Sequence, residues 1–164
     1  MALTDGEPGE AVTEATDTAL GDEALALLQR LTANPHAAFH DDQRGASEAL
    51  VGERRRVLLV QRTGWGKSVV YFLATRILRD AGAGPTLLIS PLLALVRNQL
   101  AMAERLGIRA HTIHSQNIDD WNEAEADLAA DRCDVLLVSP ERLGNPDFVR
   151  RVLPLVRDRL GLFV

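Results

Sequence analysis

Short apolar runs alternate with amphipathic stretches along most of the chain, and this alternation limits the possible folds more than any other feature. The runs are typical of strands that are buried on both faces. They lie at 57–60, 86–89, 110–113, 135–138 and 162–164. Helical patterns separate them, at 67–80, 92–106, 119–131 and 146–159. Because strands and helices alternate at a spacing of roughly 25 residues, the pattern predicts an α/β fold, with a parallel sheet between two layers of helices.

Two more helices are expected ahead of the first apolar run. One extends from residue 22 to the Asn34-Pro35 pair, and the other covers residues 42–51. Residues 1–20 are small, polar and acidic, with glycine and proline among them, so we expect a disordered tail there. The predicted organisation is therefore an acidic tail over 1–20 and one domain over 21–164.

The charge of the chain belongs to that tail. The formal net charge is −5, and five carboxylates within residues 1–20, where no lysine or arginine occurs, account for all of it. The rest of the chain therefore has no global positive field of the kind that many DNA-binding modules show. Any nucleic acid would have to be held by a local surface that contains arginine.

Composition also restricts the expected compartment. No apolar run approaches the ~18 residues that a membrane span requires. The N-terminus has no basic segment followed by an apolar core, so no secretory signal is visible. The only cysteine, Cys133, cannot form an internal disulfide. We therefore expect a protein of the reducing cytoplasm, with no membrane partner.

The segment that joins the first apolar run to the helix at 67–80 carries the most specific chemistry. It reads Gln61-Arg62-Thr63-Gly64-Trp65-Gly66-Lys67-Ser68. Glycines allow backbone N–H groups to turn toward phosphate oxygens, and the start of a helix adds partial positive charge. Lys67, the only lysine, would reach the β- and γ-phosphates of a nucleotide, and the Ser68 hydroxyl would ligate Mg²⁺. The sequence thus predicts a phosphate-binding loop, with the Trp65 ring exposed and directed away from the phosphates.

Gln61 stands where the strict phosphate-loop pattern has glycine, a departure that the first motif of superfamily-two helicases allows. Four segments resemble motifs of the RecQ family of ATP-dependent DNA helicases, in the family's order. They are Phe39-His40-Asp41-Asp42-Gln43, the loop at 62–68, the Ser-Pro-Leu segment within 89–99, and Ser139-Pro140-Glu141-Arg142-Leu143. Trp65 occupies a position where the family commonly has a small residue. The resemblance covers residues 22–164.

This resemblance implies a RecA-like P-loop NTPase motor domain that uses ATP and Mg²⁺. It further implies that the nucleotide is bound by Gln43, Thr63, Gly64, Trp65, Gly66, Lys67 and Ser68, with Lys67 catalytic and Ser68 a ligand of the metal. In the family, an acidic Asp-Glu motif (Walker B) directly follows a strand like the one at 161–164. We therefore expect a domain truncated before these acids, whose parent gene continues into Asp-Glu within one to three residues of Val164. Such a chain would bind ATP without hydrolysing it, and its second motor domain would be its partner.

Individual side chains suggest how the ligands are held. The Gln43 amide has a donor and an acceptor, which suits the N6/N7 edge of adenine, although an exposed glutamine at a helix start would look the same. Ser90, Pro91 and Ser139 follow strands, at the sheet edge where ligands bind. Together with Arg97 and Arg142 they are expected to hold DNA phosphates independently of sequence. The alternative for both arginines is a surface salt bridge.

Other functions stay open at this point. A non-catalytic ATP- or DNA-binding module fits the same motifs, and so does an RNA-directed helicase of the DEAD-box kind. A GTPase is excluded because its Asn-Lys-x-Asp motif would need a lysine besides Lys67. A phosphate-loop kinase fits poorly with two Ser-Pro strand ends.

Overall fold

The computed structural model describes residues 9–91, 93–113 and 121–164. Its elements, in chain order, are α1 (Gly9–Thr32), α2 (Gln43–Val51), α3 (Lys67–Asp80), β1 (Thr86–Ile89), α4 (Leu93–Arg105), β2 (Ala110–Ile113), α5 (Trp121–Ala129), β3 (Val135–Val138), the 3-10 helix η2 (Pro140–Gly144), the π-helix η3 (Phe148–Val152), α6 (Leu153–Arg157) and β4 (Leu162–Phe163). Strands and helices alternate from α3 onward, as predicted. The single helix expected over 146–159 is instead built from η3 and α6.

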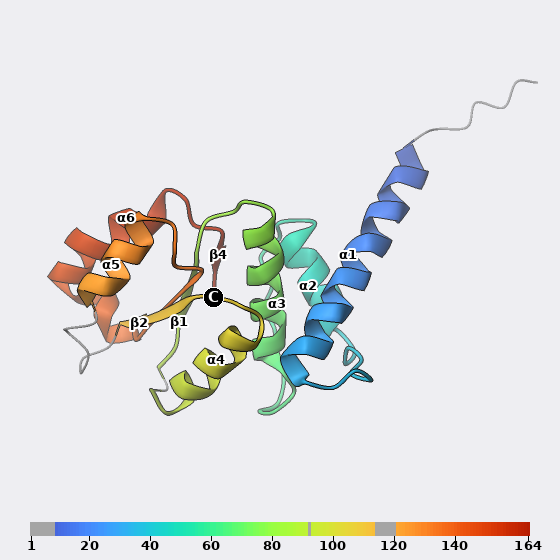
Figure 1. The fold of residues 1–164 in the computed structure, drawn as a ribbon, viewed down its shortest axis with the longest axis horizontal. Coiled ribbons are helices and arrows are strands. Elements are labelled where there is room, and N and C mark those ends of the chain that lie inside the picture. The colour runs from blue at the N-terminus through green and yellow to red at the C-terminus, as the bar shows by residue number, and fades with distance from the viewer. Residues whose placement is uncertain (1–8, 92, 114–120) are drawn as a thin grey trace, which may run out of the picture.

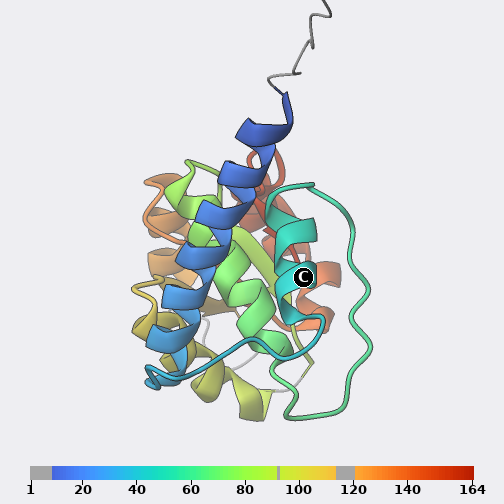
Figure 2. The same cartoon turned by 90° about the vertical axis from the view of Figure 1, so that its right-hand side faces the viewer.

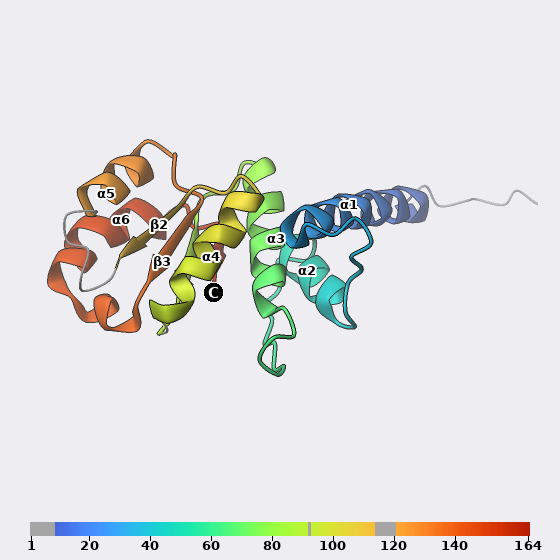
Figure 3. The ribbon, with the colours of Figure 1, turned by 60° about the horizontal axis from the view of Figure 1, so that its bottom comes forward.

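The four strands form one parallel sheet in the order β2-β3-β1-β4. Alternate side chains enter two separate cores. Leu88, Val135 and Leu137 join the core formed with α1, α3 and α4. Leu87, Leu136 and Val138 join the core formed with α5, η3 and α6. Figures 1 and 3 show the sheet between these two helical layers, and the predicted α/β architecture is confirmed.

Helices α1 and α2 lie outside α3, on the side that faces away from the sheet (Figure 3). Leu28 and Leu31 of α1 are buried against this layer. The helix begins at Gly9, so residues 9–20, which we expected to be disordered, are helical, and this part of α1 projects beyond the body (Figure 1). The reason lies in composition: alanine, glutamate and leucine favour helix, and no proline occurs after Pro8 until residue 35. The remainder of the expected tail, residues 1–8, lies outside the described residues.

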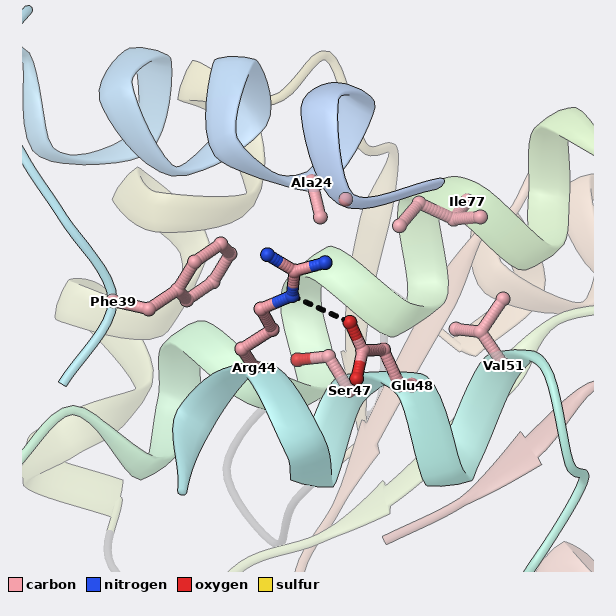
Figure 4. A pocket seen from close by; sticks show the side chains of 8 residues that line it. Ala24, Phe39, Arg44, Ser47, Glu48, Val51 and Ile77 are labelled. Atoms are coloured by element: carbon pink, nitrogen blue, oxygen red, sulfur yellow. Dashed lines mark hydrogen bonds and ion pairs between the residues drawn. The ribbon is translucent and has the colours of Figure 1, made fainter. Parts of the chain in front are cut away.

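The Arg44 side chain of α2 lies against α1. Arg44 donates from Nε to Glu48 Oε1 at 2.6 Å, across one turn of α2 (Figure 4). A Cβ at Gly21 of α1 would lie 2.7 Å from an Arg44 Nη atom, so only glycine lets the guanidinium approach this closely. The cavity beside this pair has a volume of about 10 Å³ and apolar walls that include Phe39 and Ile77. It is a packing gap too small for a ligand.

A buried ion-pair network anchors the amino end of β3. The Asp134 carboxylate accepts hydrogen bonds from Arg79 Nε at 2.8 Å and from Arg109 Nη2 at 2.8 Å. Burial alone would raise the pKa of Asp134, but the hydrogen bonds from Arg109 and Arg79 outweigh it and lower the pKa to about 2. Neighbouring Cys133 is a buried free thiol that donates to the Val135 carbonyl, and burial raises its pKa to about 12.

The first apolar run is not part of the sheet, so the strand expected at 57–60 was a wrong prediction. The connection between α2 and α3 arches away from the body (Figure 2), and Leu58 and Val60 are 90% and 80% exposed. The edge strand nearest to this segment, β4, pairs with β1 on one side only. A cavity of about 460 Å³, lined by Leu59 and Leu162 among others, separates β4 from the segment. Since a strand needs a neighbour for its backbone hydrogen bonds, an apolar run without one stays irregular.

No helix within the part of the chain that the structure describes is long and apolar enough to cross a membrane.

Candidate nucleotide-binding site

The loop ahead of α3 has the backbone that a phosphate site needs. Gly64 and Gly66 adopt left-handed conformations, with φ of 84° and 96°, which residues with a Cβ rarely adopt. Helix α3 begins directly afterwards, at Lys67, and its first turn is closed by a bond from the Val69 N–H to the Gly66 carbonyl at 2.9 Å. The start of a 14-residue helix therefore faces the loop, with partial positive charge on its free N–H groups.

Gln43, the first residue of α2, forms hydrogen bonds with this loop. It is 2% exposed, and its Nε2 donates to the Trp65 carbonyl at 3.0 Å and to the Gly66 carbonyl at 3.5 Å. Its Oε1 accepts from the His40 N–H at 2.9 Å. A Cβ at Gly66 would lie 2.6 Å from Gln43 Nε2, so the close approach requires glycine there. Gln43 is thus no exposed helix-start residue, and both ends of its amide are bonded to backbone. That Gln43 binds the adenine base stays a prediction. To contact the base, the amide would have to give up these hydrogen bonds to the backbone.

The side chain of Lys67, the only lysine, folds back over the loop that precedes α3. Lys67 Nζ donates to the carbonyl oxygens of Gln61 at 2.6 Å and Arg62 at 3.0 Å. These two neutral acceptors hold the ammonium against the loop. Phosphate oxygens carry negative charge and would be stronger acceptors than the carbonyls.

The aromatic ring inside the loop has a neighbour. The Trp65 ring is half-buried, with its centroid 6.4 Å from that of His40 and the two planes tilted by 33°. The expected exposed ring is therefore partly covered. Thr63, by contrast, is exposed.

Two residues that the sequence analysis did not single out lie beside the loop. Tyr71 of α3 accepts a hydrogen bond at Oη from Nε2 of Gln99 of α4, at 3.2 Å. Burial raises the pKa of the Tyr71 hydroxyl, and the hydrogen bond from Gln99 and the nearby Ser68 side chain offset part of that rise. One signal could have indicated Tyr71: it stands three residues after Ser68, on the same helix face.

The carboxyl ends of β1 and β3 bring Ser90 and Ser139 together. Both line a small cavity of about 10 Å³, and the Ser90 N–H donates to the Val138 carbonyl at 3.0 Å. Ser139 is 4% exposed, and its hydroxyl donates to Glu141 Oε1 at 2.5 Å. As placed, the Ser139 side chain is turned inward and presents no hydroxyl to a DNA backbone. The other four candidate nucleic-acid residues stand nearer the surface.

Those four differ in their surroundings. Pro91 and Arg97 are exposed, and Ser90 is half-buried. Arg142 is half-buried, with its guanidinium carbon 5.5 Å from the centroid of the buried Trp121 ring, a cation–π contact. Within residues 9–91, 93–113 and 121–164, neither arginine forms an ion pair, so the salt-bridge alternative is not found there.

Comparison with known protein families identifies the family of the chain. The DEAD/DEAH box helicase family model matches residues 40–164. The chain belongs to this family. The RecQ resemblance is confirmed as well, by relatives of that name from several organisms.

Three of these relatives show the extent of the similarity. The ATP-dependent DNA helicase Q-like 5 of Arabidopsis thaliana is 33% identical over 135 residues, which are 82% of this chain and 14% of that protein. The ATP-dependent DNA helicase RecQ of Bacillus subtilis is 29% identical over 113 residues, 68% of this chain and 18% of that protein. The RecQ helicase of Synechocystis is 34% identical over 91 residues, 55% of this chain and 18% of that protein. This DEAD/DEAH box chain therefore spans less than a fifth of the length of the curated relatives it matches.

Proposed function

We propose that this chain is the ATP-binding part of an ATP-dependent DNA helicase, and that it binds ATP and Mg²⁺ through the loop at 61–68. One observation carries the proposal: two left-handed glycines lead directly into the start of α3, where the only lysine follows. That combination offers backbone N–H groups, a helix terminus and an ammonium to the same phosphates.

Each residue of the loop has a distinct task in this proposal. The loop N–H groups donate to phosphate oxygens, and the Lys67 ammonium exchanges the carbonyls of Gln61 and Arg62 for the β- and γ-phosphates. The Ser68 hydroxyl ligates Mg²⁺, which neutralises charge on the phosphates when bound. Gln43 keeps the loop in place and, by exchanging a backbone bond for the base, favours adenine.

DNA is proposed to bind at the carboxyl edge of the sheet, through phosphates and without regard to sequence. Ser90, Pro91, Arg97 and Arg142 would make these contacts, and the names of the relatives favour DNA over RNA. Coupling of hydrolysis to strand separation would require a second motor domain as partner.

A non-catalytic role for this chain on its own is favoured by one observation. Among the described residues, no aspartate or glutamate lines the cavity next to Lys67, and no cluster of three or more metal-ligating side chains occurs. Phosphoryl transfer to water requires a group that orients the water. We therefore propose that the 164-residue chain binds ATP·Mg²⁺ without turnover.

The test is nucleotide-dependent thermal stabilisation of the chain and its Lys67→Ala variant. ATP·Mg²⁺ at 100 times its Kd should stabilise the unaltered chain by ~2.7 kcal/mol, which raises Tm by roughly 5–10 °C. The variant lacks the ammonium and should show almost no rise. Arg150→Ala removes one positive charge from an exposed pair with Asp147 and should respond like the unaltered chain. Equal rises in the chain and in Lys67→Ala would refute the site.

A further inference from the structure

The Arg142 guanidinium lies over the ring of Trp121, with its central carbon 5.5 Å from the ring centroid. Trp121 begins α5, the helix that comes after β2, and Arg142 stands in η2, directly after β3. In a parallel sheet the segments that follow the strands start at its carboxyl edge, so this contact lies at the edge that also carries Ser90. It therefore belongs to the surface where we propose that DNA binds.

Trp121 is a costly residue for the place it occupies. It is 5% exposed and packs into the core formed with α5, η3 and α6. Its indole N–H is buried and finds no acceptor among the described residues. Because a buried donor without a partner is unfavourable, phenylalanine or leucine would fill this space at lower cost. What tryptophan adds is the strongest attraction for a cation of any aromatic ring, and Arg142 is the cation that it contacts.

The guanidinium held on this ring lacks an anionic partner in the described part of the chain. Arg142 forms no ion pair there, and the adjacent Glu141 carboxylate accepts from the Ser139 hydroxyl instead. Its Nε is buried without an acceptor, whereas neither Nη nitrogen is in that position. The attraction to the ring uses one face of the guanidinium and none of its N–H groups. The Nη nitrogens are thus left to donate to a phosphate.

Holding the side chain in advance raises affinity for an anion. Arginine has a long, flexible side chain, and its ordering on binding costs free energy. A guanidinium that already rests on a buried ring has lost this freedom before a phosphate arrives. More of the interaction between arginine and phosphate therefore appears as affinity.

We propose that Trp121 is a positioning residue, whose ring holds Arg142 in place for a phosphate of single-stranded DNA. The inference rests on the proposed function, because it takes Arg142 as a DNA contact. It gives a core residue that itself touches no ligand a share in the affinity for DNA. A purely structural tryptophan would affect stability alone, whereas a positioning tryptophan affects DNA binding only while Arg142 is present.

The experiment measures the affinity of the full 164-residue chain for a fluorescent single-stranded oligothymidylate, at several salt concentrations. Trp121→Leu, Arg142→Ala and the double variant complete a double-mutant cycle. Phe148→Leu is the matched control for the tryptophan, because it removes a fully buried ring from the same core. Arg157→Ala is the control for charge, since Arg157 forms an exposed ion pair with Asp158 where α6 ends, ahead of β4.

Arg142→Ala should weaken binding about tenfold and reduce the slope of log K against log salt by about 0.7, the share of one phosphate contact on a single strand. Trp121→Leu should weaken binding about fivefold in the unaltered chain, but less than about 1.5-fold when residue 142 is already alanine. Both controls should stay within about 1.5-fold of the unaltered chain. If Trp121→Leu does not fold, Trp121→Phe replaces it in the cycle with an expected loss of about threefold, because the smaller ring attracts the cation less.

A second readout is spectroscopic and leaves Trp121 unaltered. The chain has two tryptophans, so the indole N–H groups give two ¹⁵N resonances, and the one that disappears in the Trp121 variant is assigned to it. That resonance should move when the oligothymidylate is saturating. In Arg142→Ala it should stay in place, because the connection from phosphate to ring is missing.

The outcomes separate the two proposals. If Arg142→Ala weakens binding but the Trp121 variant does not, or weakens it equally with and without Arg142, the positioning role is wrong and the DNA contact stands. A Trp121 resonance that moves equally in Arg142→Ala also contradicts the positioning role. If the unaltered chain does not bind the oligothymidylate, or binds it as tightly as Arg142→Ala does, the proposed DNA contact fails and the positioning role fails with it.

Discussion

The tetrapeptide Val-Leu-Leu-Val occurs twice in this chain, at 57–60 and at 135–138, and its two copies have opposite structures. The second copy is β3, buried at all four positions between β1 and β2. The first copy lies outside the sheet, with Leu58 90% exposed. Because the local sequence is identical, the difference comes from the neighbours that each copy finds. An apolar run becomes a strand when another strand pairs with it.

The residues that precede the two copies differ as well. Asp134, ahead of β3, is buried and bonded to Arg79 and Arg109, so the strand is anchored at its amino end. Arg56, ahead of the first copy, is exposed. The ion-pair network therefore fixes where β3 begins, and the first copy has no counterpart of it among the described residues.

The largest effect that this comparison predicts is on stability. Leu136→Ala leaves a cavity in the centre of the sheet and should reduce the free energy of unfolding by about 2–5 kcal/mol. Leu58→Ala makes the same chemical change in the exposed copy and should alter it by less than about 0.5 kcal/mol. Urea denaturation of both variants measures the two values. Similar losses in both would show that the two copies are equally buried.

A smaller effect should appear as the pH falls. The pKa of Asp134 is about 2 in the folded chain against an ordinary value of 3.8, so the ionised carboxylate favours the folded state. Its contribution of ~2 kcal/mol is fully present above about pH 4 and is lost as the pH falls toward 2. Between pH 4 and pH 2, the free energy of unfolding of Asp134→Asn should therefore fall by ~2 kcal/mol less than that of the unaltered chain. Asp147→Asn, at an exposed ion pair, serves as the control, and identical pH profiles for all three proteins would contradict the anchoring role.

The smallest effect on stability is expected from a charge placed in the exposed copy. Leu58→Lys should leave the free energy of unfolding within about 0.5 kcal/mol, because the side chain is already in water. It should reduce self-association, since Leu58, Val60 and Phe163 are exposed apolar side chains beside the unpaired edge of β4. Sedimentation velocity measures this association. A destabilisation of several kcal/mol would mean that this segment is buried in solution.

Most of the sheet could be predicted from the sequence, because its strands are apolar on both faces and its helices are amphipathic. β1, β2, β3 and β4 were all expected where they occur. The run at 57–60 carried the same signal and was wrong, because pairing depends on residues distant in sequence. The start of α1 was missed for a different reason: acidity and glycine suggested disorder, while alanine and leucine in the same stretch favour helix.

In the candidate site, the sequence could indicate which residue types stand in the loop but not where their polar groups point. Glycines at 64 and 66 suggested a loop of unusual backbone, and the structure shows a left-handed conformation at both. That Gln43 bonds to the loop carbonyls, and that the Ser139 hydroxyl turns inward to Glu141, depends on the packing of separate elements. Tyr71 was not identified from the sequence because its hydrogen-bond partner Gln99 belongs to another helix.

The buried thiol of Cys133 gives the chain an internal chemical probe. Alkylating reagents attack the thiolate, and burial together with a pKa of about 12 keeps that form scarce in the folded state. Because the chain has no other cysteine, its rate of alkylation reports how often the start of β3 opens, without any substitution. A cysteine introduced at an exposed position would react first, so fluorophores can be attached there selectively while the natural thiol stays unmodified.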